Sequence, residues 1–438
     1  MSKKSNTFCV YPWMHQMASP TGKVNFCCIS HTTYITNDDN KPFDLSKDSF
    51  QSAWNSGYMK NIRQKMLTGE KVIGCDTCYN QEAIGKKSYR QQYNEEWTKK
   101  LGPSLEERIS FSIKNGFAVN APPVYLDLRL GNLCNLKCRM CNPHNSVMIE
   151  KEWNDLDTRS QGMYSSFWKK YGEHNGHILP WYESNNFWTS VETSIPHLQK
   201  VYLTGGEPTL IQGNYRFLRS CIDKGYANNI ELFFNINFTN LSDEFLNLIK
   251  EFKWVSINAS VDGYNEVNEY IRGNSRWNIT DKNINKFLSA KLRNCSLGFS
   301  PVIQIYNILN ITDLFNYIEQ LVETYGLYTL VDLLFCYHPL FLSHSILPQP
   351  IKNRAVDTIE AWSQKSKLMQ SSHNNSFFIK NGVASLLNSL KSSDFTEDNS
   401  KLNDFIYYTR TLDRQRQQSF EVVLPELAGA LKNAGYSI

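Results

Sequence analysis

The chain has 438 residues, with 46 lysines and arginines against 42 aspartates and glutamates, and 11 cysteines. The length suggests about two to three domains with enough chain for a hydrophobic core, and the 13% aromatic content excludes a disordered composition. A net charge of +4 does not indicate a nucleic-acid partner.

The N-terminal segment MSKKSNTFCVYPWMHQ is basic but lacks the apolar core of a signal peptide. No run approaches the roughly 18 apolar residues of a membrane helix. We therefore predict a cytoplasmic protein without a membrane partner. Because disulfides are rare in the cytosol, the cysteines are expected to be buried, catalytic or metal-binding.

The first 80 residues hold five cysteines, which makes this region the first candidate metal site. They are Cys9, Cys27, Cys28, Cys75 and Cys78, and the last two form a C-x2-C pair. Such a pair is typical of metal sites, four-cysteine zinc sites among them. We predict a cysteine-rich module at residues 1–120.

A strand-like run at 124–130 leads into three further cysteines, Cys134, Cys138 and Cys141, spaced C-x3-C-x2-C. Three cysteines so close together in a loop cannot fill separate core positions, and disulfides among them would be strained. Three thiolates can hold three irons of a [4Fe–4S] cluster and leave the fourth iron open. A closed metal site would need a fourth ligand, for which His144 is the nearby candidate.

The stretch from Cys141 to Gly205 has 63 intervening residues, which is long for one crossover. It predicts an insertion at about 145–195. The insertion carries four tryptophans, Trp153, Trp168, Trp181 and Trp188. It is either a helical subdomain with its own core or a lid over a substrate.

The next strand-like run, at 200–205, ends in the turn Gly205-Gly206-Glu207-Pro208. A glycine pair lets the backbone approach a ligand closely, and the Glu207 carboxylate can accept hydrogen bonds from an ammonium group. Alone this turn is a weak signal, and its position downstream of C-x3-C-x2-C strengthens it.

Four more strand-like runs follow, separated by helical patterns such as 241–252 and 311–326. The runs are 230–237, 254–261, 300–307 and 330–338. Alternation of strands and helices over residues 121–340 predicts a parallel sheet. Residues 341–438 predict a mainly helical extension, whose charged run at 410–418 is typical of a solvated helix face.

Polar side chains alternate with aliphatic ones along most of these strands, so one face would pack on helices and the other would face a lumen. The polar positions are Asp127 and Arg129, Asn235 and Asn237, Ser256, Asn258 and Ser260, Gln304 and Tyr306, and Asp332, Cys336 and His338. These groups either satisfy one another, as an Asp127–Arg129 pair would, or line a cavity for polar ligands. Asp127, Arg129 and His338 are the candidates for substrate contacts.

The three-cysteine loop and the downstream GGEP turn together resemble the radical S-adenosylmethionine (SAM) enzyme superfamily. The resemblance implies a partial (β/α)6 barrel, a TIM-like α/β fold with its chemistry at the carboxyl ends of the strands. It also implies that Cys134, Cys138 and Cys141 hold a [4Fe–4S] cluster whose open iron binds SAM. In this superfamily the reduced cluster cleaves SAM, and the resulting 5′-deoxyadenosyl radical abstracts a hydrogen atom from the substrate.

The resemblance also assigns the SAM contacts. Gly205, Gly206 and Glu207 would face the SAM amine, and Arg272 resembles the arginine that binds the SAM carboxylate. The segments VSINASVDG (255–263) and EYIRGNSRW (269–277) match the superfamily as well. The further candidates for SAM contacts are Asn237 and Ser260.

One position departs from the superfamily pattern. Met140 stands where an aromatic side chain usually packs against the adenine. Methionine can still pack on a flat ring, so SAM binding is still expected.

The N-terminal cysteines resemble a second module. From Cys9 to Cys27 the spacing is C-x12-G-x4-C, similar to the opening half of the SPASM and twitch modules, which hold auxiliary Fe–S clusters. By this resemblance Cys9, Cys27, Cys75 and Cys78 would bind one complete [4Fe–4S] cluster, with Cys28 as an alternative to Cys27 and a four-cysteine zinc site as the alternative to the cluster. Such modules normally follow the barrel, whereas this one precedes it.

These features predict a radical SAM enzyme, an oxidoreductase or another C–H-modifying enzyme, whose auxiliary cluster transfers electrons. A peptide or amino-acid-like substrate is favoured over a nucleotide, a sugar or another small polar metabolite. The expected partner is an electron donor such as a flavodoxin or ferredoxin. The alternative of another class is a non-catalytic Fe–S or zinc protein that binds a partner or RNA.

Overall fold

The computed structural model describes residues 5–30, 34–83, 87–153, 155–168, 179–327, 329–373, 376–392 and 397–438. Internal contacts divide the chain into two compact units. The first unit comprises Met1–Leu133, Ile178–Phe234 and Asn247–Val255, and the second comprises Cys134–His177, Asn235–Leu246 and Ser256–Ile438. The second unit therefore begins at the first cysteine of the C-x3-C-x2-C loop.

Eight strands form one mostly parallel sheet in the order β11-β9-β7-β6-β5-β3-β1-β2, which confirms the predicted α/β class. They are β1 (His15–Ala18), β2 (Val24–Asn25), β3 (Tyr125–Arg129), β5 (Lys200–Thr204), β6 (Glu231–Ile236), β7 (Trp254–Ala259), β9 (Cys295–Phe299) and β11 (Leu330–Val331). Two short sheets pair β4 (Lys137–Cys138) with β8 (Arg272–Gly273) and β10 (Val302–Ile303) with β12 (Leu334–Phe335).

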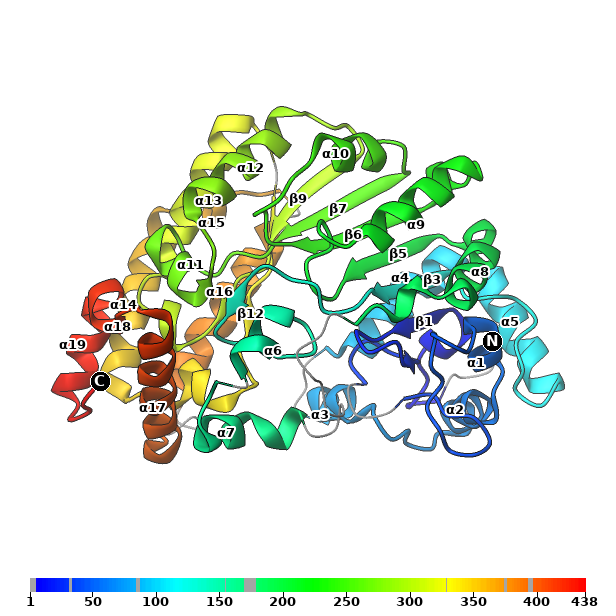
Figure 1. Cartoon of the computed structure of the whole chain (residues 1–438), viewed down its shortest axis with the longest axis horizontal. Coiled ribbons are helices and arrows are strands. Elements are labelled where there is room, and N and C mark those ends of the chain that lie inside the picture. The colour runs from blue at the N-terminus through cyan, green and yellow to red at the C-terminus, as the bar shows by residue number, and fades with distance from the viewer. Residues whose placement is uncertain are drawn as a thin grey trace. The chain divides into compact units, whose positions relative to one another are not determined.

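Strand β3 is parallel to both of its neighbours in the first unit. Leu126 of β3 pairs with Gln16 of β1 on one side and with Val201 of β5 on the other. Figure 1 shows β5 and β6 side by side, as their parallel pairing requires. Leu126 and Leu128 are fully buried, because β3 is covered on both faces.

Strand β1 is not among the predicted strands, and it joins the cysteine-rich N-terminal region to the sheet through β3. Its sequence, HQMA, shows no alternation because all four residues are buried. Its polar side chains each contact a backbone carbonyl: His15 Nδ1 lies 3.1 Å from Phe26 O, and Gln16 Nε2 donates to Phe50 O at 3.2 Å. The division into domains 1–120, 121–340 and 341–438 stays a prediction.

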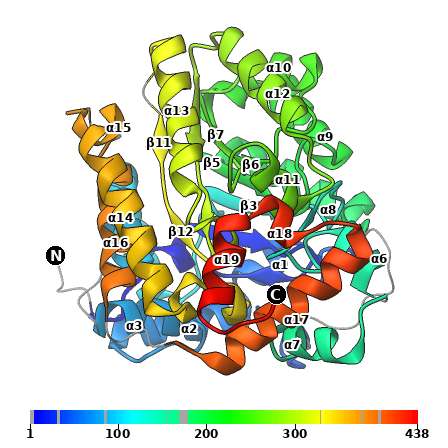
Figure 2. The same cartoon turned by 90° about the vertical axis from the view of Figure 1, so that its left-hand side faces the viewer.

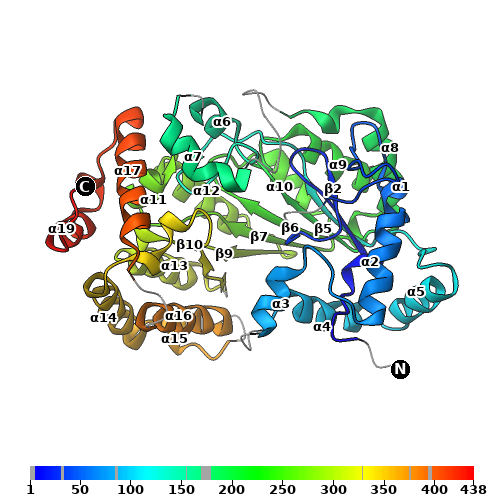
Figure 3. The ribbon, with the colours of Figure 1, turned by 90° about the horizontal axis from the view of Figure 1, so that it is seen from below.

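The helices of the first unit surround these strands. They are α1 (Phe50–Trp54), α2 (Gly57–Thr68), α3 (Asp76–Ala83), α4 (Tyr89–Leu101), α5 (Pro103–Lys114), α8 (Asn185–Ser194) and α9 (Gln212–Asp223). Helix α2 starts at the Ser56 cap and ends at Gly69, whose φ of +88° suits glycine. Buried Arg63 of α2 donates to the Trp54 carbonyl of α1, and Figure 3 shows these two helices together.

In the middle of the chain, helices alternate with strands as predicted. They are α6 (Val147–Trp153), α7 (Thr158–Trp168), α10 (Asp243–Ile249), α11 (Glu266–Ile271), α12 (Trp277–Ser289) and α13 (Ile311–Tyr325). Helix α13 buries Leu314, Ile318 and Leu321 on one face and ends at Gly326 in the left-handed conformation. None of the described helices combines the length and apolarity that a membrane span requires.

The last two predicted strands are wrong in part. In place of the fifth predicted strand, the sheet contains β9, which ends before the predicted run 300–307. That run holds Pro301, which has no N–H for a ladder, and then β10 and the 3-10 helix η6 (Ile305–Asn307). Gln304 caps η6, so it does not line a strand face with Tyr306.

The predicted run 330–338 divides into β11 and β12. Asp332 lies between the two short strands, and its amide donates to Phe299 O. His338 lies beyond β12 and is exposed. The predicted polar face of this strand, with Asp332, Cys336 and His338 in one row, is therefore wrong.

The C-terminal region is helical, as predicted. Its helices are α14 (Gln349–Lys365), α15 (Lys367–Gln370), α16 (Ser376–Lys391), α17 (Asn399–Arg416), α18 (Phe420–Val423) and α19 (Pro425–Asn433). Figure 2 shows α14 alongside α16, in agreement with their close packing. The solvated face predicted at 410–418 is wrong in part, because the side chain of Arg416 is buried against Glu152.

The predicted insertion at 145–195 divides between the units: α6 and α7 belong to the second unit and α8 to the first. Trp181 packs on the first unit, where its Nε1 donates to Pro20 O at 2.9 Å and its ring closes on Gly22. A Cβ at Gly22 would lie 2.8 Å from that ring. The side chain of Trp168 lies outside the described residues, and a lid role stays a prediction.

Candidate functional site

The C-x3-C-x2-C loop contains strand β4, which positions Cys138. Because β4 pairs antiparallel with β8, Cys138 lies opposite Arg272. The Arg272 Nη1 donates to the Cys138 Sγ at 3.8 Å, and the Leu136 amide donates to the Cys134 Sγ at 3.5 Å. Two sequence-predicted site residues, Cys138 and Arg272, are thus in contact in the second unit.

The Arg272 guanidinium is held by a buried carboxylate. Its Nε lies 2.7 Å from Oδ2 of Asp262, whose side chain is fully buried. Asp262 Oδ1 also accepts the Val302 amide at 2.8 Å. Asp262 is not among the predicted site residues, although it is the one charged residue of VSINASVDG (255–263) and could have been found on that ground.

Burial works against the thiolate form of two of the loop thiols. Burial raises the pKa of Cys138, an effect that the Arg272 guanidinium opposes. Burial and the neighbouring Cys138 raise the pKa of Cys141 to about 12. Metal ligation needs thiolates, so irons would supply the positive charge that the buried sulfurs lack. Three soft sulfur donors fit an iron–sulfur cluster with one open iron.

A polar cluster stands beside the first cysteine of the loop. Asn237 Nδ2 donates to Asn135 Oδ1 at 3.1 Å, and Asn135 Nδ2 donates to Thr239 Oγ1 at 2.8 Å. Asn237 Oδ1 in turn accepts the amide and hydroxyl of Thr239. Ser260 follows β7, and its amide donates to Ile236 O at 2.8 Å. The structure thus brings Asn237 to the cysteine loop through Asn135.

The GGE turn, in the first unit, packs its backbone on the residues just before Cys134. The Glu207 amide donates to Leu133 O at 2.7 Å, and a Cβ at Gly206 would lie 2.1 Å from the same oxygen. Gly205 has a φ of +113°, which a side chain would strain. The glycine pair is therefore required by a close approach to the chain's own backbone, at Gly131 and Leu133.

The Glu207 carboxylate is almost fully buried. Its Oε1 accepts the Thr209 amide at 3.2 Å and the Thr209 hydroxyl at 2.6 Å. These bonds fix the orientation of the carboxylate in the turn.

Asp127 and Arg129 of β3 bind one another. Arg129 Nε and Nη2 donate to the two Asp127 carboxylate oxygens at 3.1 and 2.9 Å. Burial raises the pKa of the fully buried Asp127, and the Arg129 guanidinium opposes that shift. This geometry fits the alternative in which the two polar groups satisfy each other.

Four N-terminal cysteines, Cys9, Cys27, Cys75 and Cys78, line one small cavity of the first unit. Cys9 precedes the 3-10 helix η1 (Tyr11–Trp13), Cys27 follows β2, and the C-x2-C pair lies at the start of α3. Among the described residues, Cys28 does not line this cavity, and its Sγ lies 3.9 Å from the Tyr93 Oη. The cavity therefore separates the two adjacent cysteines that sequence reasoning left as alternatives.

The same cavity is lined by Arg90, which sequence reasoning missed and which shows no distinguishing pattern in the sequence. Its guanidinium binds both carboxylate oxygens of Glu82 and donates to Phe8 O at 2.6 Å. Burial and the neighbouring Cys78 raise the pKa of Cys75 to about 12, and the Arg90 charge works in the opposite direction. The Ile29 amide donates to the Cys27 Sγ at 3.5 Å.

The donor set of the cavity is four thiols, which suits a fully ligated iron–sulfur cluster or zinc. Among the described residues, no three histidine, cysteine, aspartate or glutamate side chains are arranged to hold a single metal ion. Thiolates on one zinc lie close together, whereas those of a cluster bind different irons and are spread more widely.

Comparison with known proteins gives one family match. Residues 128–318 match the profile of the Radical SAM superfamily. No curated protein gives a significant match.

Solved structures give further similarities. The chain is similar to native anSMEcpe with bound AdoMet, at 16% identity over 55% of this chain and 61% of that chain, with a TM-score of 0.34. It is also similar to Streptococcus suis SuiB bound to S-adenosylmethionine, at 12% identity over 76% and 68%, with a TM-score of 0.38. A third is the radical S-adenosylmethionine methyltransferase TsrM from Kitasatospora setae, at 10% identity over 46% and 32%, with a TM-score of 0.31. The chain spans less than two thirds of the length of the first and third.

Proposed function

We propose that the chain is an enzyme that cleaves SAM and abstracts a hydrogen atom from a polar substrate, because residues 128–318 match the profile of the Radical SAM superfamily. The observation that carries the proposal is the Arg272–Asp262 pair at Cys138, inside the C-x3-C-x2-C loop. A buried cation at a thiol that must lose its proton favours ligation over a packing role.

In this proposal Cys134, Cys138 and Cys141 hold a [4Fe–4S] cluster. A cluster held by these residues would supply the electron for reductive cleavage of SAM. Arg272 offers its remaining N–H groups to the SAM carboxylate, and Asp262 keeps the guanidinium in that orientation. Asn237 and Ser260 offer further polar contacts.

In the same proposal, the GGE turn binds the amine of SAM. Gly205 and Gly206 keep the backbone close to Leu133, just before the first cluster ligand. Glu207 provides the carboxylate for the SAM amine, and its bonds to Thr209 hold it ready.

We place an auxiliary [4Fe–4S] cluster at Cys9, Cys27, Cys75 and Cys78. Their shared cavity supports this assignment, and it supports Cys27 over Cys28. Four thiolates leave no open iron, so the cluster would transfer electrons rather than bind substrate. The alternative at this site is a four-cysteine zinc.

The substrate we favour is a peptide or an amino-acid-like molecule, with a nucleotide, a sugar or another small polar metabolite as the alternative. Asp127, Arg129 and His338 stay the candidates for substrate contacts, although Asp127 and Arg129 already bind each other and His338 lies beyond the strand β12. The proposed setting is the cytoplasm, with a flavodoxin or ferredoxin as electron donor. A reaction that oxidises the substrate would use the auxiliary cluster to carry one electron away.

One anaerobic experiment tests the enzyme proposal. The protein is reconstituted with iron and sulfide, reduced with dithionite and given SAM, and 5′-deoxyadenosine is measured by chromatography. We expect its formation by the wild type and its loss in the Cys134/Cys138/Cys141→Ala triple variant. A wild type that binds the cluster and SAM but forms no 5′-deoxyadenosine would favour the alternative class, an Fe–S or zinc protein that binds a partner or RNA.

The metal content of the same triple variant tests the auxiliary site separately. About four irons per chain support the second [4Fe–4S] cluster. Zinc in their place, in protein isolated without reconstitution, contradicts it.

A further inference from the structure

The residue that follows Cys138 ties the cysteine loop to the far end of the chain. Arg139 is fully buried, and its Nη2 donates to the Asp413 carboxylate and, at 2.9 Å, to Gln418 Oε1. Its Nε donates to Tyr270 O at 3.0 Å. Asp413 lies in helix α17 and Gln418 just beyond it, so the loop is bonded to residues about 270 positions away.

The environment of Arg139 is built for a guanidinium. The guanidinium carbon of Arg139 lies 3.7 Å from the centre of the Tyr270 ring and 5.3 Å from the centre of the Tyr306 ring. Asp413 also accepts the Tyr270 hydroxyl at 2.8 Å and the Phe420 amide at 2.6 Å. Both members of the buried charge pair therefore take part in several hydrogen bonds, as a buried charge requires.

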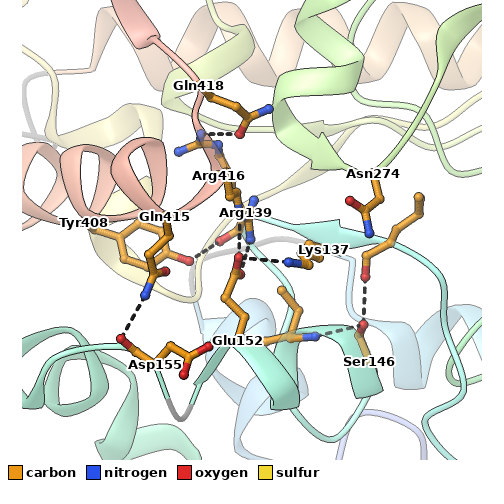
Figure 4. A network of polar contacts seen from close by, with 12 residues as sticks. Lys137, Arg139, Ser146, Glu152, Asp155, Asn274, Tyr408, Gln415, Arg416 and Gln418 are labelled. Atoms are coloured by element: carbon orange, nitrogen blue, oxygen red, sulfur yellow. Dashed lines mark hydrogen bonds and ion pairs between the residues drawn. The ribbon is translucent and has the colours of Figure 1, made fainter.

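The backbone of the loop is held at the same residue. The Arg139 amide donates to Ile271 O at 2.8 Å, next to Arg272. The Arg139 carbonyl accepts the hydroxyl of Tyr408, which also belongs to α17, at 3.0 Å. Figure 4 shows Tyr408 directed at Arg139. Helix α17 thus contacts both the side chain and the backbone carbonyl of Arg139, through Asp413 and Tyr408.

A second ion pair joins α17 to helix α6, which follows the loop in the chain. Arg416 Nε donates to Glu152 at 2.9 Å, and Glu152 also lies 3.5 Å from the Lys137 ammonium (Figure 4). Glu152 lies in the last turn of helix α6, and Lys137 precedes Cys138. The Arg416 guanidinium packs against Gly273, where a Cβ would lie 3.0 Å from its Nη1.

We propose that helix α17 positions the C-x3-C-x2-C loop for cluster binding, with Arg139–Asp413 and Arg416–Glu152 as the two positioning pairs. The proposal rests on the proposed function, because it takes Cys134, Cys138 and Cys141 to be the cluster ligands. It gives the C-terminal extension a role that no chemical motif in its sequence reveals.

Burial and placement distinguish this role from ordinary packing. Two buried ion pairs are a costly way to hold a helix, since apolar side chains of similar size are often at least as stabilising. Ion pairs with fixed geometry instead define one arrangement of the residues they join. The first pair includes Arg139, the residue after Cys138, and Glu152 of the second pair also lies 3.5 Å from Lys137, the residue before Cys138.

Coupling between two sites is reciprocal, so cluster binding must also order α17. Hydrogen exchange of the full chain, with and without iron and sulfide reconstitution, measures this. We expect about tenfold slower exchange of the α17 amides (399–416) in the loaded wild type. The Cys134/Cys138/Cys141→Ala triple variant should show no slowing when its remaining iron is loaded.

Equal exchange in the loaded and unloaded wild type, with the cluster shown to be bound at the three cysteines, would overturn the proposal. A wild type whose iron content does not depend on these cysteines would instead overturn the proposed function. The two failures are therefore distinguishable.

Variants give a second measurement. Asp413→Asn is expected to release iron to a chelator about tenfold faster than wild type and to alter the electron paramagnetic resonance signal of the reduced cluster with SAM. The matched control is Glu231→Gln on β6, a half-buried carboxylate paired with Lys100, which should change neither. Wild-type release and signal in folded Asp413→Asn would contradict the proposal.

A milder pair covers the case in which Asp413→Asn fails to fold. Tyr408→Phe removes one hydrogen bond to Arg139 O and should speed iron release by about fivefold. Tyr317→Phe, which removes a buried phenol bond to Asp281 elsewhere in the second unit, should not. Equal release in both variants would contradict positioning by α17.

Discussion

The two cysteine sites differ in how much of the chain is needed to build them. The C-x3-C-x2-C loop gathers three thiols within residues 134–141, whereas the N-terminal cavity draws four thiols from three separate segments of the first unit. Each site nevertheless has a buried arginine held by a carboxylate: Arg272 by Asp262, and Arg90 by Glu82. A local motif is readable without a fold, while ligands far apart in sequence are assigned only when the fold brings them together.

The largest expected effect comes from removing one ligand at each site. Cys138→Ala should abolish 5′-deoxyadenosine formation, because the three-cysteine loop has no spare thiol. Cys75→Ala should keep SAM cleavage and lower the iron content by about four per chain. Iron analysis and chromatography of the same samples provide the two measurements. Loss of SAM cleavage in Cys75→Ala with the first cluster intact would break the separation between the sites.

The next prediction concerns the neighbouring thiols Cys27 and Cys28. Cys27→Ala should lose the auxiliary metal, because Cys27 lines the cavity, and Cys28→Ala should retain it. Both variants remove one half-buried thiol from the same turn, so each is the control for the other. Metal analysis in the background of the Cys134/Cys138/Cys141→Ala variant isolates the site. If Cys27→Ala retained the auxiliary metal and Cys28→Ala lost it, Cys28 would be the ligand instead of Cys27.

A third prediction compares the two arginine–carboxylate pairs. Asp262→Asn should raise the KM for SAM about tenfold, because Arg272 loses the charge that orients it. Glu82→Gln releases Arg90 in the same way at the other site and should leave that KM unchanged. Steady-state formation of 5′-deoxyadenosine at varied SAM concentration measures both. A larger KM in Glu82→Gln than in Asp262→Asn would mean that the pairs do not serve separate sites.

The fold was predictable where strand and helix periods are regular. Strands β3, β5, β6 and β7 and helix α13 lie where apolar alternation and helical spacing place them. Strand β1 could not be predicted, because its four buried residues show no alternation and its polar side chains bond to distant carbonyls. The runs 300–307 and 330–338 failed because Pro301 and short irregular segments interrupt the ladder.

The candidate site shows the same limit. The spacing of Cys134, Cys138 and Cys141 is a local signal, and so is the GGE turn. Asp413 and Arg416 carry no such signal, because their partners Arg139 and Glu152 stand more than 250 residues earlier. Their charges look like a solvated helix face in the sequence, and only tertiary contact shows that two of them are paired inside the protein.

The smallest expected effect is one that both cysteine sites share. Burial raises the pKa of Cys75 and of Cys141 to about 12, from an ordinary value of 9.0. Between pH 9 and 12 the folded protein without metal therefore keeps protons that the unfolded chain has lost. Its free energy of unfolding should fall as pH rises through this window, by at most about 1.4 kcal/mol per pH unit for each thiol, and should not change on this account below it.

Urea unfolding of metal-free protein at about pH 8 and about pH 10 measures the decline. Cys75→Ala and Cys141→Ala should each remove part of it, because alanine has no proton to lose. A decline of the same size in both variants and in the wild type would assign it to other groups, such as lysines. If only one of the two variants removes the decline, the two sites differ in how deeply they bury their thiols before metal binds. The local loop and the cavity assembled by the fold would then differ in their metal-free state as well.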